Sequence, residues 1–183
     1  MELQIDRMPS PIGIILLVAG AHGLVSLDFE DYEVRLNALL AKRYGAFRLV
    51  PAQGSPEVRA ALQGYFAGNL GAVDAIAVDT GGTGFQREVW QGLRRIPAGT
   101  VTSYGELAAS LGRAGASRAV GYANSLNPIA IVVPCHRVVG RDRSLTGYAG
   151  GLERKRWLLA HEAQHSECDR LRGEMALSYG EGN

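Results

Sequence analysis

The chain has 183 residues, a length that suits one ordinary domain or two small ones. Its hydrophobic fraction of 46% is typical of a globular protein. No apolar run approaches the roughly 20 residues needed to cross a bilayer, and the first residues lack the apolar core of a secretory signal. These features argue against a membrane-spanning or exported chain, and we expect a cytoplasmic protein.

The net charge of +1 conceals an uneven distribution. Residues 85–160 hold eleven lysines and arginines against four acidic residues, whereas the rest of the chain holds eight against fourteen. A basic half indicates a polyanionic partner such as nucleic acid. An arginine-rich surface that contacts only water explains the charge equally well, so charge alone leaves both interpretations open.

Cysteine and histidine usage indicates neither a metal site nor a disulfide framework. The two cysteines, Cys135 and Cys168, are too few for such a framework and lack the spacing of metal ligands, and the four histidines are scattered. We expect reduced thiols, as in intracellular proteins, with no metal and no cofactor. Cys168 lies in a polar segment with no base nearby in sequence, so we expect no catalytic role for it.

Residues 1–80 predict a small α/β unit without a catalytic constellation. Ser55 followed by Pro56 begins one helix, and Gly45 ends another. We interpret this unit as a scaffold with a small antiparallel sheet. Its expected elements, in chain order, are a hairpin of two strands within 11–29, a helix over 31–45, a strand over 46–50, a helix over 55–68 and a strand over 72–79.

The glycine-rich segment 79–84, DTGGTG, is the best candidate for a domain boundary. It does not match a phosphate-binding loop, because no Lys-Ser/Thr pair follows the glycines. We expect a scaffold domain over 1–80, a second domain over 85–165 and a polar C-terminal tail over 166–183 that is in part helical. The last strongly amphipathic segment before this tail is the helix expected over 152–162.

The second half has a helical pattern. Residues 85–96 place their apolar side chains on one face, and residues 103–112 begin with a capping box of Ser103 and Glu106. Residues 113–128 predict a third helix, and two short helices joined by a glycine-containing turn are typical of a helix-turn-helix unit. Its small side chains allow close approach to DNA but read base edges poorly, which favours weak sequence specificity. The alternative for residues 113–128 is a core helix that packs through its small residues, because such a helix has the same spacing.

Residues 128–140, PIAIVVPCHRVVG, place a thiol, an imidazole and a guanidinium at the end of an expected buried strand over 129–133. A cysteine attacks as its thiolate, so a nucleophilic Cys135 needs a nearby base. His136 is adjacent, but neighbouring side chains in a strand point to opposite faces. Contact therefore requires a turn or a helical start, which Pro134 favours, or a bridging water. A buried structural thiol is the alternative for a lone cysteine.

Two further polar residues are candidates for this site. Glu162, at the end of the expected helix 152–162, is the candidate that orients the imidazole, and Asn127 is the candidate that fixes the backbone before the strand. A Cys/His/Glu relay is ordinary nucleophile chemistry. A cysteine hydrolase that uses Cys135, His136 and Glu162 is an alternative function, but it leaves the basic helix-turn-helix unit without a role.

Longer segments around these residues resemble a known family. NPIAIVVPCHRVVG, followed by LTGYAGGLERKRWLLAHE, resembles the active-site signature of the O6-alkylguanine-DNA alkyltransferases, the methylated-DNA–protein-cysteine methyltransferases. FQREVWQGLRRIPAGTVTSYGELAASLG resembles the start of the family's helix-turn-helix unit, and SRAVGYANSLNP resembles its recognition helix. The resemblance is close over 85–162 and extends to 1–80 only in outline.

This resemblance implies DNA repair by direct reversal, in which an alkyl group moves irreversibly from O6-alkylguanine, and from O4-alkylthymine, to Cys135. The base must be flipped out of the duplex, and the thioether product means that each molecule acts once. The implied fold is a ribonuclease H-like α/β domain followed by a winged-helix-like DNA-binding domain. The implied protein is a DNA-associated monomer that binds the minor groove of double-stranded DNA with low sequence specificity.

The resemblance also implies roles for individual residues. Cys135 is the acceptor, His136 takes its proton through water, Glu162 steadies His136, and Asn127 braces the segment. Tyr104 is implied as a donor toward the guanine oxygen or leaving purine, and Arg118 as the finger that replaces the flipped base. The backbone carbonyls of Val138 and Cys135 are implied to accept hydrogen bonds from the guanine amine. Tyr148 is implied to form a wall of the pocket, and Ala149 to offer its backbone N–H as a donor. The surface facing DNA is expected to include Ser103, Ala116, Ser117, Ala119 and Gly121.

The chain departs from the family pattern in a few places. Ala149 stands where some members have serine, a change that a backbone donor survives. Ala130 stands where some relatives have proline, which is expected to loosen the pocket wall and change the tolerance for bulky alkyl groups. The zinc ligands of some members' N-terminal domains have no counterpart here. Alkyltransferase-like damage sensors replace the acceptor cysteine, so the presence of Cys135 favours transfer over sensing.

Overall fold

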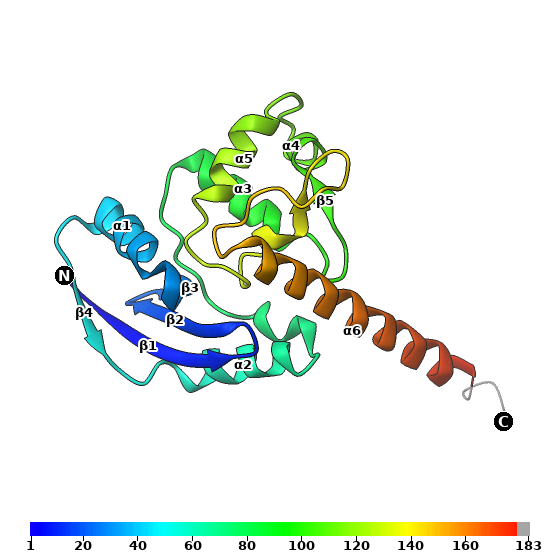
Figure 1. The fold of residues 1–183 in the computed structure, drawn as a ribbon, viewed down its shortest axis with the longest axis horizontal. Helices are drawn as coiled ribbons and strands as arrows, with labels where there is room; N and C mark the ends of the chain where they lie inside the picture. Colours follow the sequence, from blue (N-terminus) through cyan, green and yellow to red (C-terminus); the bar gives the residue numbers. More distant parts are fainter. Residues whose placement is uncertain (179–183) are drawn as a thin grey trace.

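The computed structural model describes the backbone of residues 1–178 and the side chains of residues 1–166. A small sheet with two helices forms the N-terminal half, and short helices form most of the C-terminal half (Figure 1). The long helix α6 (Leu152–Ser178) contacts segments of both halves. The described part of the predicted tail 166–183 therefore continues α6. Cys168 lies on α6, but its side chain is outside the described residues. No helix of the described chain is long and apolar enough to cross a membrane.

The N-terminal sheet is mixed, with its four strands in the order β3-β2-β1-β4. β1 pairs antiparallel with β2, and β2 pairs antiparallel with β3, each through a tight turn. The hairpin of β2 and β3 is the one that the sequence predicts within 11–29. β4 pairs parallel with β1 because the chain crosses over through α1 before it returns to the sheet, so the expectation of a purely antiparallel sheet was wrong. The elements are β1 (Glu2–Ser10), β2 (Gly13–Gly20), β3 (Gly23–Phe29), η1 (Glu30–Tyr32), α1 (Glu33–Tyr44) and β4 (Arg48–Pro51).

Residues 72–79 do not form the predicted strand. The 3-10 helix η2 (Leu70–Val73) occupies the first part of this region, and Val78 makes only an isolated bridge with Leu24 of β3. η2 packs instead against α2 (Pro56–Phe66). The segment is rich in alanine, which is depleted in strands, and its small side chains permit this close helix packing.

Two helices begin where their predicted capping residues place them, whereas the helix expected over 113–128 spans only Ser117–Ser125 and has no side-chain cap. The Ser55 hydroxyl caps α2, with Pro56 in the first helical position. Ser103 and Glu106 form the predicted capping box, in which each side chain accepts a hydrogen bond from the backbone N–H of the other. The second half contains α3 (Gly84–Arg94), α4 (Tyr104–Ser110), α5 (Ser117–Ser125) and a parallel pair of short strands, β5 (Thr102–Ser103) and β6 (Val138–Val139).

Residues 129–133 are buried, but they form turns instead of the predicted strand. Ile129 makes a single bridge with β3, and Ile131 has a left-handed φ of 67°. Asn127 closes the turn, because its side-chain amide donates to the Val133 carbonyl at 2.7 Å and its side-chain oxygen accepts from the Ile129 N–H at 3.0 Å. An apolar run inside a core is buried in either conformation, so its composition does not distinguish them.

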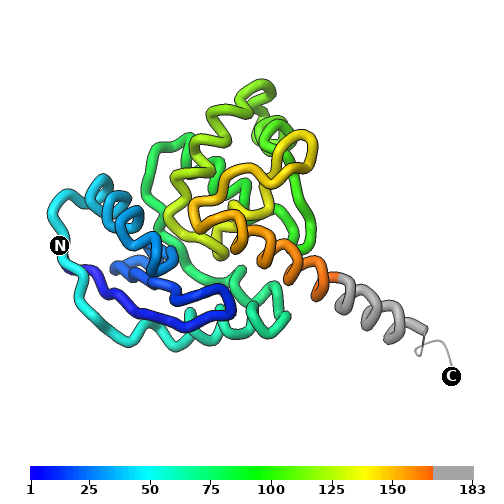
Figure 2. The backbone as a smooth tube through the Cα atoms, in the orientation of Figure 1, coloured from blue at the N-terminus to red at the C-terminus, as the bar shows by residue number. Residues whose placement is uncertain are grey.

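The two halves of the chain lie against each other (Figure 2), and one hydrophobic core extends through both. It contains side chains from the sheet, from all five helices α2 to α6 and from the turns at 129–133. The Leu27 N–H donates to the Pro128 carbonyl at 3.0 Å, and the Ala130 N–H donates to the Leu27 carbonyl at 2.9 Å. The expected boundary at 79–84 therefore does not interrupt the core. A second, smaller cluster fills the space between α1 and the other face of the sheet.

Candidate active site

Cys135 lies in η3 (Cys135–Arg137), one turn of 3-10 helix that begins directly after Pro134. This geometry confirms the turn or helical start that contact between the thiol and His136 requires. The Cys135 side chain is buried, and burial raises the pKa of its thiol, an effect that the neighbouring Asn127 amide only partly offsets. In the free protein Cys135 is therefore a thiol that needs a base before it can attack.

His136 is bound to Glu162, which reaches it from α6. The His136 Nε2 and the Glu162 Oε1 lie 2.8 Å apart, and both side chains are completely buried. Burial lowers the pKa of His136, and the opposing effect of Glu162 is smaller. A neutral imidazole that donates from Nε2 carries its lone pair on Nδ1. That Nδ1 atom is buried and has no hydrogen-bond partner among the described residues.

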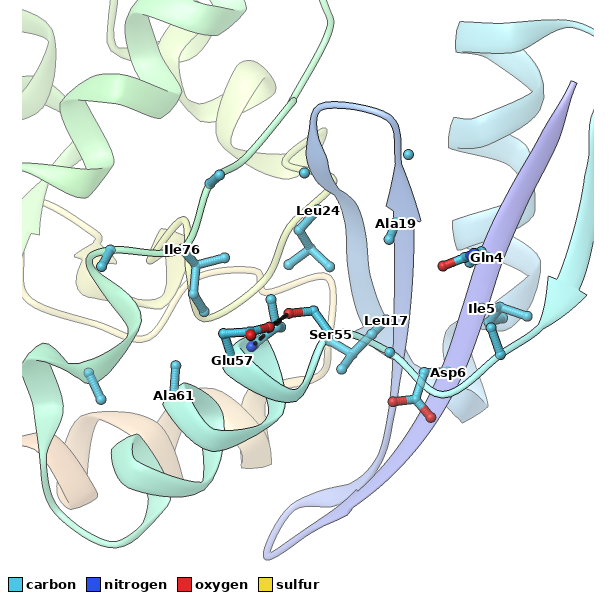
Figure 3. Close-up of a pocket in the computed structure, with 18 residues that line it drawn as sticks. Gln4, Ile5, Asp6, Leu17, Ala19, Leu24, Ser55, Glu57, Ala61 and Ile76 are labelled. Carbon is cyan, nitrogen blue, oxygen red and sulfur yellow. Dashed lines mark hydrogen bonds between the residues drawn. The ribbon is translucent and has the colours of Figure 1, made fainter.

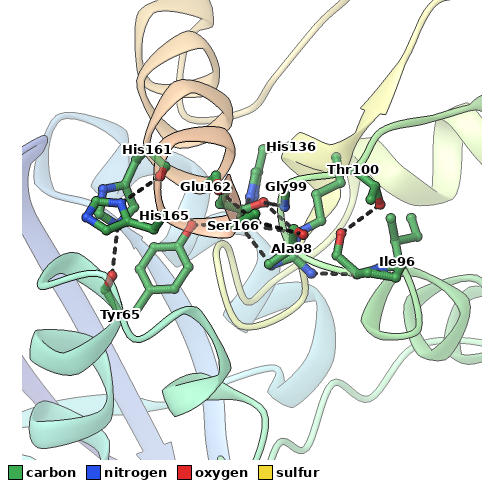
Figure 4. Close-up of polar contacts among 12 residues, drawn as sticks. Tyr65, Ile96, Ala98, Gly99, Thr100, His136, His161, Glu162, His165 and Ser166 are labelled. Carbon is green, nitrogen blue, oxygen red and sulfur yellow. Dashed lines mark hydrogen bonds and ion pairs between the residues drawn. The ribbon is translucent and has the colours of Figure 1, made fainter. Parts of the chain in front are cut away.

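Glu162 accepts hydrogen bonds from four residues that come from three other segments of the chain (Figure 4). Besides His136, it accepts from Nε and Nη2 of Arg137, both at 2.9 Å, from the Tyr65 hydroxyl at 2.7 Å and from the Gly99 N–H at 3.1 Å. Burial by itself raises the pKa of Glu162, but the hydrogen bonds from His136 and Arg137, together with the positive charge of Arg137, outweigh it and hold the pKa below its ordinary range. The carboxylate is ionised at neutral pH.

Asn127 lies where the sequence predicts a brace for this segment, and the N-terminal half supports it from outside. Arg35 of α1 donates to the Asn127 backbone carbonyl at 2.9 Å and forms an ion pair of 2.5 Å with the buried Asp28. Together with the turn that the Asn127 side chain closes, this contact ties α1 and β3 to the backbone that leads to Cys135.

The Val138 carbonyl, an expected acceptor for the guanine amine, already has a partner. Lys155 of α6 is buried and donates through Nζ to the carbonyls of Val138 at 2.6 Å and Thr146 at 2.8 Å. Burial lowers the pKa of Lys155 to about 8, against the opposing influence of Cys135. A carbonyl oxygen has two lone pairs, so Val138 retains one for a further donor.

Tyr148 stands beside the cysteine, with its ring edge-on to His136 at a centroid distance of 6.5 Å. Its hydroxyl is buried without a partner among the described residues, and burial raises its pKa well above the ordinary value. Ala149 follows it in a half-buried position. This placement fits the predicted pocket wall and leaves the Tyr148 hydroxyl available to a ligand.

The surface of α5 carries Arg118, Ala119 and Tyr122, all exposed, while Ala116 and Ser117 at its start are half-buried. Tyr122 is 65% exposed and was not among the predicted site residues. It lies four positions after Arg118, so the two side chains share one face of the helix. The predicted finger therefore stands next to an exposed aromatic ring.

Tyr104, the first residue of α4, packs against α5. A Cβ added to Gly121 would lie 3.5 Å from the Tyr104 ring, so Gly121 faces Tyr104 and is half-buried. The Thr146 hydroxyl approaches the Tyr104 hydroxyl at 3.5 Å. Ser103 is only 7% exposed and its hydroxyl caps α4, so its expected place on the DNA-facing surface is corrected to a position at the helix cap.

Sequence analysis missed three residues of the buried network: Tyr65, Arg137 and Lys155. Arg137 lies within the Pro-Cys-His-Arg motif, and its position next to Cys135 and His136 in the sequence could have indicated that it belongs to the site. Tyr65 lies 97 positions before Glu162, and no local pattern connects them. Lys155 looks like one cation among several on an amphipathic helix, and only the structure shows that it is buried.

The cavity between the sheet and α2 lies apart from this site (Figure 3). It has a volume of about 570 Å³, and its lining is largely apolar, with many alanines. None of the predicted site residues lines it. The cavity therefore contributes nothing to the surroundings of Cys135, whose chemistry is defined by its partners.

Comparison with known proteins identifies the family. Residues 84–164 match the family model described as 6-O-methylguanine DNA methyltransferase, DNA binding domain. The chain is 49% identical over 165 residues to the methylated-DNA–protein-cysteine methyltransferase of Salmonella typhimurium, which covers 88% of this chain and 96% of that protein. It is 43% identical over 161 residues to that of Methanosarcina barkeri, covering 86% of this chain and 95% of that protein.

Solved structures share the fold. The Mycobacterium tuberculosis OGT in complex with DNA superimposes with a TM-score of 0.74 at 38% identity, covering 90% of this chain and 94% of that one. The O6-methylguanine-DNA methyltransferase of Pyrococcus kodakaraensis gives 0.69 at 26% identity, covering 87% and 98%. These relatives confirm the resemblance that the sequence motifs carry. The chain belongs to the methylated-DNA–protein-cysteine methyltransferase family.

Proposed function

We propose that this chain repairs DNA by moving an alkyl group from the O6 atom of guanine to the sulfur of Cys135. Membership of the family makes the chain a methyltransferase that repairs DNA by direct reversal, with transfer to a cysteine of its own. One observation supports Cys135 as the acceptor. It lies beside His136, whose Nε2 is bound to Glu162 and whose buried Nδ1 has no partner among the described residues.

The first step is removal of the thiol proton. Because the pKa of His136 is lowered by burial, its imidazole is neutral near neutral pH and is ready to act as a base. Its Nδ1 lone pair takes the proton from Cys135, directly or through a water. The ionised Glu162 then stabilises the imidazolium that results.

The second step is displacement at the alkyl carbon. The Cys135 sulfur bonds to that carbon as the carbon–oxygen bond breaks, and the electron pair leaves with the guanine oxygen. Tyr104 donates a hydrogen bond toward the leaving purine, which takes up a proton from water and becomes ordinary guanine, while the His136 imidazolium returns its proton to water. Water does not readily hydrolyse the thioether, so transfer is irreversible and each molecule acts once. O4-alkylthymine presents the same alkyl–oxygen bond and is a second substrate.

The lesion must leave the base stack to reach a buried sulfur. Cys135 is only 4% exposed, so the alkylated nucleotide has to be flipped into the pocket. The carbonyls of Cys135 and Val138 receive the guanine amine, Tyr148 forms the wall and the Ala149 N–H approaches the base. Ala130 leaves more room here than proline does, which favours tolerance of larger alkyl groups.

The exposed face of α5 enters the minor groove. Arg118 fills the space that the flipped nucleotide leaves, and Ala116, Ser117, Ala119 and Gly121 line the approach. Because these side chains are small and offer few donors or acceptors to base edges, binding is weakly specific for sequence. Contacts to phosphates supply most of the affinity, so binding weakens as salt rises.

The wider organisation follows the same proposal. The strand order β3-β2-β1-β4, with three antiparallel strands and β4 parallel to β1, supports a ribonuclease H-like N-terminal domain over 1–80. The helices α3 to α5 and the strand pair β5 and β6 support a winged-helix-like domain over 85–165. Residues 166–178 continue α6 beyond the second domain, as part of the C-terminal tail proposed over 166–183. The protein acts as a monomer on double-stranded DNA inside the cell.

Intact mass tests this proposal most directly. The protein is mixed with a duplex that carries one O6-methylguanine, with Cys135→Ala as the matched control. We expect a gain of one methyl group in place of one proton, mapped to Cys135 and saturating at one per chain. An unchanged mass with the duplex bound would identify a damage sensor, and repeated turnover of an ester substrate would identify a hydrolase.

A further inference from the structure

Tyr65 comes from α2, in the N-terminal half that the sequence marks as scaffold, yet it reaches the relay of the C-terminal half. Its hydroxyl donates to Glu162 Oε1 at 2.7 Å, and the phenol is completely buried (Figure 4). Its ring packs against Phe66 and His161, each with a centroid distance of 5.4 Å. The ring is therefore fixed from two sides, with its hydroxyl directed at Glu162.

Tyr65 shares its acceptor atom with His136. Glu162 Oε1 accepts from the Tyr65 hydroxyl and from His136 Nε2 at 2.8 Å, whereas the Gly99 N–H binds the other oxygen, Oε2. Burial raises the pKa of Tyr65 far above its ordinary value, so the phenol keeps its proton and acts only as a donor toward Glu162. A donor on Oε1 withdraws electron density from the atom that holds His136.

We propose that Tyr65 is a positioning residue for alkyl transfer, which fixes Glu162 Oε1 against His136 Nε2 and moderates the pull of that oxygen on the imidazole. The proposal rests on the proposed function of Cys135, His136 and Glu162. Without Tyr65, Oε1 attracts the imidazolium form of His136 more strongly. The base is then protonated over a wider pH range and is less often free to take the thiol proton.

Glu162 is the hydrogen-bond partner of the Tyr65 hydroxyl among the described residues, so removing that hydroxyl should leave the other groups around His136 in place. Arg137 and Gly99 limit how far the carboxylate can move, so the expected change is a shift of Oε1 against His136 Nε2 without release of Glu162. The charged and titratable groups that face His136 are Glu162 and Lys155 of α6, Arg137 and Cys135 of η3, and Tyr148 of the loop before α6. A change caused by Tyr65 alone therefore reports the Tyr65–Glu162 contact.

The test uses Tyr65→Phe, which removes the hydroxyl and keeps the ring. NMR titration of His136 in the free protein and the pH dependence of the single-turnover rate on an O6-methylguanine duplex are measured in parallel. We expect the pH midpoint of the His136 titration and the pH midpoint of the acid limb of the rate profile to rise together by about 0.5–1 pH unit. A rise of one unit corresponds to a tenfold loss of rate on that limb. Phe66→Leu, which loosens the same aromatic packing without touching Glu162, is the control.

A second variant acts in the opposite direction and does not depend on the first one folding. Incorporation of 3-fluorotyrosine at position 65 alone makes the phenol a stronger donor, and it should lower both midpoints. Unchanged midpoints in both variants, or equal shifts in Phe66→Leu, would overturn the proposal. Failure of the proposed function appears separately, as wild-type protein that leaves the duplex alkylated, and it would remove any role of Tyr65 in transfer.

Discussion

Arg137 supplies the buried positive charge beside Glu162, and replacing it with methionine tests the energetics of the network. Its guanidinium donates to both oxygens of Glu162 and, through Nη1, to the Ile96 carbonyl at 2.6 Å. Methionine keeps most of the apolar stem but leaves an ionised carboxylate in the core without a counter-charge. Removing one partner of a buried ion pair costs about 3–5 kcal/mol, and we expect Arg137→Met to lower the free energy of unfolding by that amount.

The cost depends on pH in a defined direction. In the wild type the folded-state pKa of Glu162 lies below its unfolded value of about 4.3, so the stability it contributes is complete above that value and is lost as pH falls through the folded pKa. In Arg137→Met, burial raises the pKa of Glu162, and protonation relieves the unpaired charge. The difference between variant and wild type is therefore largest near neutral pH and shrinks toward pH 5.

Urea unfolding at pH 7.5 and at pH 5.0 measures this difference. Arg156→Met is the matched control, because Arg156 lies on α6, the helix that carries Glu162, with its side chain 55% exposed, and pairs only with Glu153 in the described structure. That surface change should stay within about 0.5 kcal/mol. A loss below about 1 kcal/mol in Arg137→Met, or a loss equal at both pH values, would refute the assignment of Arg137 as the counter-charge.

Three further predictions concern the reaction and its support. Cys135→Ala should abolish alkyl transfer and spare DNA binding, as measured by intact mass and gel shift; retained transfer would exclude Cys135 as acceptor. Arg118→Ala should slow transfer from duplex DNA by about tenfold, or 1.4 kcal/mol, with little effect on the free alkylated base, and equal losses on both substrates would count against the finger role. Asn127→Ala should lower the free energy of unfolding by about 2–4 kcal/mol in urea titration, because the Val133 carbonyl and the Ile129 N–H lose their partner; a smaller loss would show that the turn holds without Asn127.

Local signals in the sequence were sufficient for the starts of α2 and α4 and for the turn at Cys135. A capping box is complete within four residues, so Ser103 and Glu106 determine the start of α4 without help from the rest of the chain. The bend at Pro134 was likewise readable, because proline and the need for thiol–imidazole contact both point to it. The family motif then placed Cys135, His136, Glu162 and Asn127 in one site, and the structure brings them together.

Other features depend on partners that lie far away along the chain. The segment 129–133 satisfies the pattern of a buried strand and of a buried turn equally, and the contacts of Asn127 and Leu27 decide between them. The parallel pairing of β4 depends on the crossover through α1, and the strand expected over 72–79 gives way to packing against α2.

The sequence by itself therefore determined the starts of α2 and α4, the turn at the predicted nucleophile Cys135 and the basic half. Only the tertiary structure decided which groups hold Glu162, because Tyr65, Gly99 and Arg137 meet it from three separate segments. Hydrogen bonds act over about 3 Å, whereas the periodicities that a sequence displays extend over a few turns of one element. A buried network drawn from distant segments leaves no such periodicity, so it becomes visible only when the chain is folded.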